Sequence, residues 1–339
     1  MSHSERTQKH RREGLPSGFS LIELTITLAI FMVVSGIVMS AMFQMTRTQG
    51  TISNRTDMHA AVRSATELLQ QEISQAGRVA APAAISLTAA VTASESGQSL
   101  TKSVSSTAGL FVGELLVVGP DASNGPSQEI VRITAIPSAN QITAVFQDPH
   151  AAGAPIAPLG TFASGVVPPA GNRILRASGS LITGETLTVA QGSSDNVLKI
   201  VGDINDDGNI LYVEYACNQG MAAAPGTLTR RVVPFNTTLP KTSFPARVLL
   251  SNILANPGGY PCFEYELKTV INDTFIINVA VTLTVQTEFR DPQTNQFQTE
   301  SKSLLNVSPR NVYQAWQLAG GGMADRVQPM PESVFNLLP

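Results

Sequence analysis

The sequence contains few of the residues that perform most enzyme chemistry. Its 339 residues include only four histidines and two cysteines. The histidines are His3, His10, His59 and His150. They form no Ser/His/Asp or Cys/His arrangement, and the sequence has no G-x-S-x-G, H-E-x-x-H, P-loop or G-x-G-x-x-G motif. We therefore predict that the protein is not an enzyme.

Charge is also scarce. Charged residues make up 14% of the chain, the net charge is -3, and lysines and arginines form no cluster with aromatic residues. A nucleic-acid-binding surface needs such a basic patch, so we predict no nucleic-acid partner. The two cysteines, Cys217 and Cys262, lack the spacing of a metal site. They could pair in an oxidising compartment or remain two small core residues in a cytosol.

A long apolar run lies near the N-terminus. Residues from Leu24 to Met45 carry no formal charge, and as a helix they would extend about 33 Å, enough to cross a bilayer core. The apolar region of a secretory signal peptide is shorter, about 7 to 15 residues. The run therefore predicts a membrane-spanning helix, preceded by a segment with four basic residues, Arg6, Lys9, Arg11 and Arg12.

The helical pattern continues beyond the apolar run. Apolar residues recur at intervals of three and four, as on one helical face: Met58, Val62, Ala65, Leu69, Ile73 and Ala76. The intervening polar face carries Arg63, Glu67, Gln70, Gln71 and Glu72. We expect one helix from about Phe19 to Ala76, about 87 Å long, with a weak point at Gly50. It makes up the predicted transmembrane and assembly segment, residues 19–77.

The sequence G-F-S-L-I-E, residues 18–23, resembles the processing site of type IV prepilins and pseudopilins. The chain is identified as a member of this superfamily, resembling a minor pilin of the PilW type. The resemblance implies that prepilin peptidase cuts after Gly18, removes residues 1–18 and methylates the new N-terminal Phe19. It also places the superfamily's glutamate at Glu23, the fifth residue of the mature chain.

Glu23 raises a physical question, because an unpaired carboxylate near the end of a membrane span costs up to roughly 3 kcal/mol. Cleavage would supply a partner, the amine of Phe19, at the same depth. In a bundle of helices, Glu23 of one subunit could then pair with Phe19 of its neighbour and set the register of assembly with other pilins or pseudopilins. The alternative is a simple membrane anchor whose acid reaches the headgroups.

The resemblance also implies where the protein resides. It places a single-pass helix in the inner (cytoplasmic) membrane and the body in the periplasm or outside the cell, before incorporation into a pilus or pseudopilus. The charge count alone gives only a slight bias, because Arg47, Arg55 and Arg63 lie on the other flank of the span. A disulfide between Cys217 and Cys262 fits a body exposed outside the cytoplasm.

After Gly77 the pattern predicts β-structure. We expect an α+β fold in which the long helix packs on an antiparallel sheet, with a β-rich body at residues 166–319. Residues 78–165 predict a small inserted β module with flexible borders, and Gly and Pro density predicts a loose tail at 320–339. Predicted strands include 110–118, 129–136, 141–146, 181–189, 197–201, 210–216 and 227–233. In the clearest one, alternation places seven residues on one face: Phe275, Ile277, Val279, Val281, Leu283, Val285 and Phe289.

One segment matches a calcium-loop template. Residues 203–214, DINDDGNILYVE, supply candidate oxygen ligands at Asp203, Asn205 and Asp207, with the carbonyl of Asn209. The flanks predict strands, which would carry Glu214 too far away to close on the same ion. The alternative is a hairpin turn in which these side chains bond their own backbone and Gly208 supplies a positive φ.

Three functions remain after these exclusions. The first is a minor type IV pilin, a structural subunit whose bulk argues against a major one. The second is a minor pseudopilin of a type II secretion system, which shares the same helix and processing chemistry. The third is a membrane-anchored extracytoplasmic binding domain that merely carries an apolar anchor.

Overall fold

A computed structural model describes residues 18–119, 128–176 and 185–339. Apart from Gly18, the predicted leader lies outside the described residues. Of the residues that the structure describes, 27% are helical and 36% lie in strands, an α+β composition as predicted. It divides into two compact units, Met1–Ser53 with Asp291–Asn295, and Asn54–Arg290 with Gln296–Pro339. This division does not follow the predicted borders at 77, 165 and 319.

Helix α1 comprises Leu21–Gln75 and dominates the N-terminal part of the chain. It contains no proline, so no residue removes a hydrogen bond from its interior. It ends where Gly77 adopts a φ of 86°, a left-handed conformation that glycine adopts without strain. The Gly77 N–H donates to the carbonyl of Val201 at 2.8 Å, which leads the chain directly onto the sheet.

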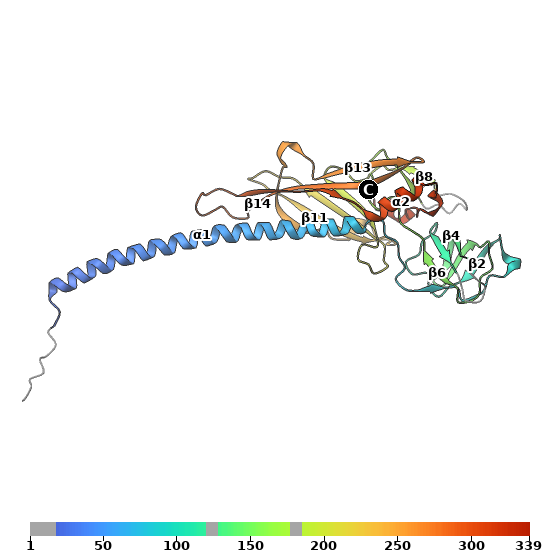
Figure 1. The fold of residues 1–339 in the computed structure, drawn as a ribbon, viewed down its shortest axis with the longest axis horizontal. Coiled ribbons are helices and arrows are strands. Elements are labelled where there is room, and N and C mark those ends of the chain that lie inside the picture. The colour runs from blue at the N-terminus through green and yellow to red at the C-terminus, as the bar shows by residue number, and fades with distance from the viewer. Residues whose placement is uncertain (1–17, 120–127, 177–184) are drawn as a thin grey trace, which may run out of the picture. The chain divides into compact units, whose positions relative to one another are not determined.

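A seven-stranded sheet forms the main part of the body, with β15 paired to β14. Along the path β13-β14-β12-β11-β10-β9, its strands are Phe263–Val270, Asp273–Gln286, Arg247–Leu254, Gly226–Pro234, Leu211–Asn218 and Val197–Gly202, and β15 is Thr299–Val307. All pairs are antiparallel. The second half of α1 lies along this sheet (Figure 1), and its six predicted apolar positions all belong to the shared core.

The predicted face of strand β14 is wrong in part. Between β13 and β14 the register shifts, because Glu266 pairs with Asn278 and the next residue pairs with Ile276. Such a bulge moves every preceding side chain to the opposite face. Val279 and the following apolar residues therefore face α1, whereas Phe275 belongs to a separate core with the C-terminal helix. Phe289, at the other end, is 63% exposed.

Residues 85–158 form a second sheet of six strands, within the span predicted to be an inserted module. The path is β1-β6-β3-β4-β5-β2, with Ile85–Ser86, Pro155–Pro158, Leu115–Val118, Glu129–Ser138, Gln141–Val145 and Ser99–Ser103. Alternate residues of β4, Val131 and Ile133, enter a core that belongs to this sheet and its connections. This sheet, called the inserted sheet below after the prediction, therefore has the layout of a half-exposed antiparallel sheet.

The C-terminal tail contradicts the expectation of loose structure. It contains 3-10 helix η4, Ala324–Arg326, and α3, Glu332–Phe335, and Gln328 and Val334 are fully buried. Its apolar residues fill a core beside Tyr212. Gly and Pro are dense here because the segment turns repeatedly, and these turns are buried by the neighbouring elements.

Shorter elements complete the fold. The α-helix before the tail is α2, Arg310–Gly320, and a two-stranded sheet joins β7, Arg173–Arg176, to β8, Glu185–Thr188. The predicted strand 181–189 lies partly outside the described residues. The remaining 3-10 turns are η1, Ala93–Glu95, η2, Lys241–Ser243, and η3, Pro257–Gly259.

Burial of Glu114 in the inserted sheet predicts a pH-dependent stability. Its carboxyl is fully buried and accepts the N–H of Phe111 at 3.0 Å, and burial raises its pKa to about 8. The folded state therefore holds a proton that the unfolded chain releases near pH 4.5. The contribution of Glu114 to the free energy of unfolding is full below that pH, falls as the pH rises to about 8 and is constant above it.

We expect Glu114→Gln to abolish this fall and to stabilise the protein above pH 8 by roughly 2 to 5 kcal/mol. Thermal melting from pH 4 to 9 would measure it. Glu67→Gln, on the exposed face of α1, is the matched control. Parallel melting profiles for the wild type and Glu114→Gln would contradict the assignment.

Candidate processing and assembly site

The predicted cleavage bond lies just before α1. Gly18, Phe19 and Ser20 are exposed and outside regular structure, and Phe19 is 85% exposed. A Cβ added to Gly18 would meet nothing within 4 Å, and Gly18 has no positive φ. The fold of this chain therefore does not require glycine at position 18, so a requirement for glycine there has to come from a partner that binds the bond.

The structure places Glu23 at the start of the helix. Its Oε2 accepts the backbone N–H of Ser20 at 3.1 Å, and the Ser20 Oγ accepts the N–H of Ile22 at 3.4 Å. Ser20 and Glu23 have the S-x-x-E spacing of a capping box. A carboxylate in the first turn also interacts favourably with the helix dipole. Sequence reasoning missed this local role, although the S-x-x-E spacing was visible.

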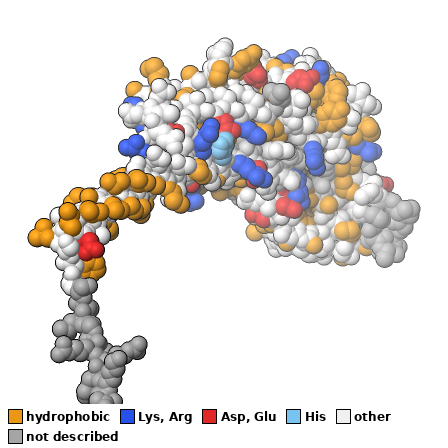
Figure 2. Space-filling view, turned by 60° about the vertical axis from the view of Figure 1, so that its left-hand side comes forward, with side chains coloured by type: hydrophobic (Ala, Val, Ile, Leu, Met, Phe, Trp, Pro, Cys, Tyr) orange, Lys and Arg blue, Asp and Glu red, His pale blue; other side chains and the backbone are white. Residues whose placement is uncertain are grey.

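The surface that follows Glu23 is apolar on all sides. The α1 helix contains an 18-residue stretch with a mean hydropathy of 2.4, and no residue of this stretch is buried. The helix is therefore long and apolar enough to cross a membrane. Figure 2 shows these apolar side chains covering the N-terminal part of the helix. Thr25 and Thr27 donate to carbonyls of Ile22 and Glu23 within the helix, at 2.9 and 2.7 Å. These hydroxyls therefore need no partner outside the helix.

Gly50, the predicted weak point, is a contact site. A Cβ at position 50 would lie 3.1 Å from Pro292 Cγ. On either side, Thr51 Oγ1 donates to Asp291 Oδ1 at 3.2 Å, and Gln293 Nε2 donates to Thr48 Oγ1 at 3.1 Å. Because Gly50 has no side chain, the loop between β14 and β15 can approach the helix closely at this position and form these hydrogen bonds with it.

One acid on the second half of α1 is buried, contrary to the predicted polar face. Glu72 is 4% exposed and accepts hydrogen bonds from Tyr215 Oη and from Arg230, whose Nε lies 3.1 Å from Oε2. Burial, reinforced by the charge of Glu72, raises the pKa of Tyr215. A buried carboxylate needs such partners, so Glu72 fixes which face of the helix meets β10 and β11.

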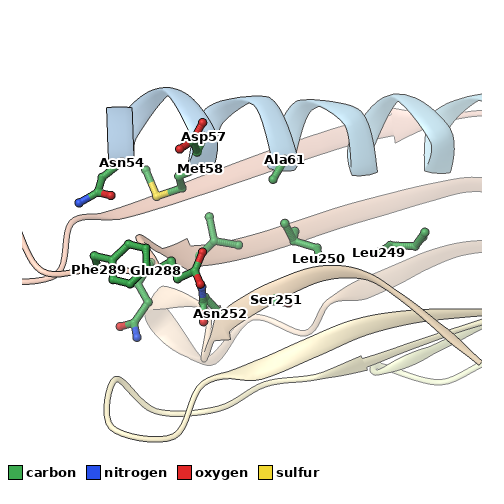
Figure 3. Close-up of a pocket in the computed structure, with 12 residues that line it drawn as sticks. Asn54, Asp57, Met58, Ala61, Leu249, Leu250, Ser251, Asn252, Glu288 and Phe289 are labelled. Carbon is green, nitrogen blue, oxygen red and sulfur yellow. The ribbon is translucent and has the colours of Figure 1, made fainter. Parts of the chain in front are cut away.

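A groove of about 320 Å³ lies between α1, strand β12 and the C-terminal end of strand β14. In Figure 3, Met58 extends from the helix toward the sheet, in which β12 carries Leu249 and Leu250. Met58 and Leu250 belong to the core, whereas Phe289 at the other side is exposed. The groove therefore marks the edge of the tightly packed contact between helix and sheet.

The two cysteines form a disulfide, which resolves the alternatives left by the sequence. Cys217 lies on β10, Cys262 immediately precedes β13, and their Cα atoms are 6.4 Å apart. Nearby, the N–H of Phe263 donates to the carbonyl of Asp195 at 2.9 Å, and Tyr265 Oη donates to that of Val197 at 2.9 Å. The disulfide therefore links β10 to the start of β13. The contacts of Phe263 and Tyr265 lie where β9 and β13, the two ends of the strand path, approach each other. Closing 45 residues this way corresponds to about 4 kcal/mol in the chain-entropy treatment.

The loop that resembles a calcium site bonds to its own backbone. Asp203 Oδ1 accepts the N–H of Asp207 at 3.0 Å, and Asp207 Oδ1 accepts the N–H of Asn209 at 2.9 Å. Gly208 has a φ of 78°, as the hairpin alternative requires. Of the four predicted ligands, these hydrogen bonds join Asp203, Asp207 and Asn209 in one turn.

A cation of the chain itself lies at this loop. Arg78 Nε is 3.7 Å from Asp203 Oδ2, and the same guanidinium contacts Asp206. Glu214 lies on β10 and accepts hydrogen bonds from Tyr212 and Lys241 at 2.7 and 2.8 Å. Throughout the described part of the chain, no three His, Cys, Asp or Glu side chains group as metal ligands would.

We expect millimolar calcium to leave the melting temperature unchanged, because the Arg78 guanidinium already contacts two of the loop carboxylates, Asp203 and Asp206. Calorimetric titration and thermal melting would both measure this, with Asp207→Asn as the comparison variant. A calcium-dependent rise in melting temperature that Asp207→Asn removes would instead assign the ion to Asp203, Asn205, Asp207 and Asn209.

Comparison with known families supports the N-terminal site. Residues 16–39 match the prokaryotic N-terminal methylation motif. This motif implies processing by prepilin peptidase and membrane association of the N-terminal helix, and with the long apolar helix it is consistent with the type IV pilin superfamily. No curated protein and no solved structure shows significant similarity to the chain.

Proposed function

We propose that the protein is a minor type IV pilin of the PilW type, a structural subunit and not an enzyme. It is cut after Gly18, methylated at Phe19 and incorporated into a pilus through its N-terminal helix. The observation that carries the proposal is the methylation motif at residues 16–39, placed at the start of an exposed apolar helix. The same helix continues under an antiparallel sheet, as expected for a subunit that joins an assembly by one end and displays a body at the other.

The proposed location follows from the same features. The helix crosses the inner membrane once, and the body lies in the periplasm or outside the cell. The disulfide between Cys217 and Cys262 supports an oxidising compartment, since such bonds are rare in the cytosol. The inserted sheet makes the subunit bulky, which favours a minor position over a subunit repeated along the whole filament.

Two alternatives use the same helix. A minor pseudopilin of a type II secretion system would be cut and methylated identically, and only the assembly in which it is found separates it from a pilin. A membrane-anchored binding domain would not need the charge of Glu23. The contact between Glu23 and the Ser20 N–H permits a sharper test of that charge than simple removal of the side chain.

Processing is the first test. We expect the mature protein from membranes of cells that contain prepilin peptidase to begin at a methylated Phe19. Gly18→Val should leave the chain uncut, and because Gly18 is in open space, this loss would reflect recognition and not misfolding. Intact-mass spectrometry measures both outcomes. Gly36→Ala, also in open space, is the control and should be cut normally; a wild-type protein that begins at Met1 would refute the proposal.

Assembly is the second test, and it uses two substitutions of Glu23. Glu23→Gln keeps an acceptor for the Ser20 N–H but loses the charge, whereas Glu23→Ala loses both. If charge pairing between subunits sets the register, both variants should insert and be cut, yet their recovery in sheared pili should fall at least about tenfold. Immunoblotting of the pilus and membrane fractions measures this.

The matched control for assembly is Glu13→Gln in the leader, which should assemble normally. Normal recovery of both Glu23 variants would support the membrane-anchored binding domain instead. Loss confined to Glu23→Ala would show that the helix cap, and not the charge, is what assembly requires.

A further inference from the structure

The outer face of the inserted sheet holds a pocket that the proposed function does not use. Its volume is about 280 Å³. On β4 the residues Ile130, Arg132 and Thr134 line it, while Val131 and Ile133, between them, enter the core of the insert. Leu115 of β3 pairs with Arg132 and contributes to the same wall. The pocket therefore lies on the side of the sheet opposite its core.

Arg132 brings a positive charge to this pocket without an ionic partner. Its Nη1 donates to the carbonyl of Gly113 at 3.0 Å, and no carboxylate of the described residues lies within ion-pair distance of it. Half-burial of the guanidinium lowers its pKa, and no neighbouring charge opposes this effect. A partly desolvated cation without a counter-charge is costly, so an anion entering the pocket would gain a charge-assisted bond.

Asp325 brings the opposite charge from another element. It lies on η4 and lines the same pocket. The position of this segment is fixed by Gln328, whose side chain accepts the N–H of Leu115 at 3.0 Å and donates to its carbonyl at 2.6 Å. Gln328 is fully buried. Asp325 is thus held at the sheet by two buried hydrogen bonds three residues away.

The two charges line one pocket but form no ion pair with each other. The same pocket is lined by the apolar side chains of Leu115, Ile130 and Val145 and by the polar side chains of Thr134 and Gln147. We propose that this pocket binds a zwitterion, a free α-amino acid with an apolar side chain. Its carboxylate bonds the Arg132 guanidinium, its ammonium faces Asp325, and its side chain lies against the apolar wall.

The charge balance distinguishes this ligand from a simple anion. A phosphate dianion would also be attracted by Arg132, but Asp325 at the rim would repel it. Asp325 is solvent-exposed, so a bare carboxylate would lack only the attraction between Asp325 and an ammonium group, whereas a bare amine would leave the partly buried Arg132 unpaired. A ligand that carries both charges interacts favourably with both side chains.

The test uses the full-length protein in detergent and thermal melting with four probes: L-leucine, N-acetyl-L-leucine, L-leucine amide and inorganic phosphate. N-acetyl-L-leucine keeps only the carboxylate and L-leucine amide only the ammonium. We expect L-leucine to raise the melting temperature more than any other probe at equal ionic strength. Equal or larger shifts with phosphate, or no shift with L-leucine at millimolar concentration, would overturn the proposal.

Variants assign the effect to the pocket. Arg132→Gln should weaken L-leucine binding at least about tenfold. Asp325→Asn should reduce the response to L-leucine to that of N-acetyl-L-leucine. Arg247→Gln, at an exposed arginine on β12, is the control and should bind normally. Unchanged binding in Arg132→Gln would place the ligand elsewhere.

A measurement on the wild type keeps the proposal falsifiable if Arg132→Gln does not fold. Phenylglyoxal modifies arginine guanidinium groups, and peptide mass spectrometry reports the rate at each arginine. L-Leucine should slow modification of Arg132 but not of Arg247. Equal rates at Arg132 with and without L-leucine would refute the site.

Discussion

The contact between the apolar stripe of α1 and the seven-stranded sheet is the interaction on which the rest of the body depends. Leu69 and Ile73 of the helix are fully buried in a core that also contains Val213 of β10 and Val281 of β14. Each such side chain contributes about 1.5 to 3 kcal/mol by leaving water. Strands far apart in the sequence thus share one partner, the helix, and the sheet cannot bury its inner face without it.

Apolar burial alone would let the helix rotate or slide on the sheet, because the hydrophobic effect does not depend on the orientation of the buried groups. The directional element is Glu72, whose carboxylate is bonded by Tyr215 and Arg230 on two neighbouring strands. A rotation or a shift by one turn would leave this acid buried without partners, a penalty comparable to the burial of an apolar side chain. The disulfide between Cys217 and Cys262 stabilises the fold in a different way. It links two parts of the sheet and lowers the conformational entropy of the unfolded chain.

Much of this architecture was predictable from the sequence, and the exceptions share a physical reason. The spacing of three and four predicted the α1 stripe, because a helix repeats every 3.6 residues whatever its partners. Glu72 was assigned to the polar face because its partners Tyr215 and Arg230 lie 143 and 158 residues away in the sequence, and the local pattern carries no information about them. The face of Phe275 was wrong because one bulge near Ile277 inverts the alternation. The tail around Gln328 was misjudged because its order comes from tertiary contacts with Leu115.

The candidate site also combines features that the local sequence pattern predicts with one that only the structure shows. The proposed cleavage bond between Gly18 and Phe19 and the acid at Glu23 lie within six consecutive residues, so sequence alone is enough to propose them. What the sequence reading lacked was the cap. Since Glu23 accepts the Ser20 N–H in the single chain, the acid has a favourable contact before any neighbour arrives, and a helix dipole that supports its charge. The amine that the proposed cleavage would create at Phe19 lies one residue from that N–H, so it would join an arrangement already suited to a carboxylate. In the proposed pilin, the helix would therefore stabilise its acid during membrane insertion, before a partner subunit is present, and the acid would pair with an amine afterwards.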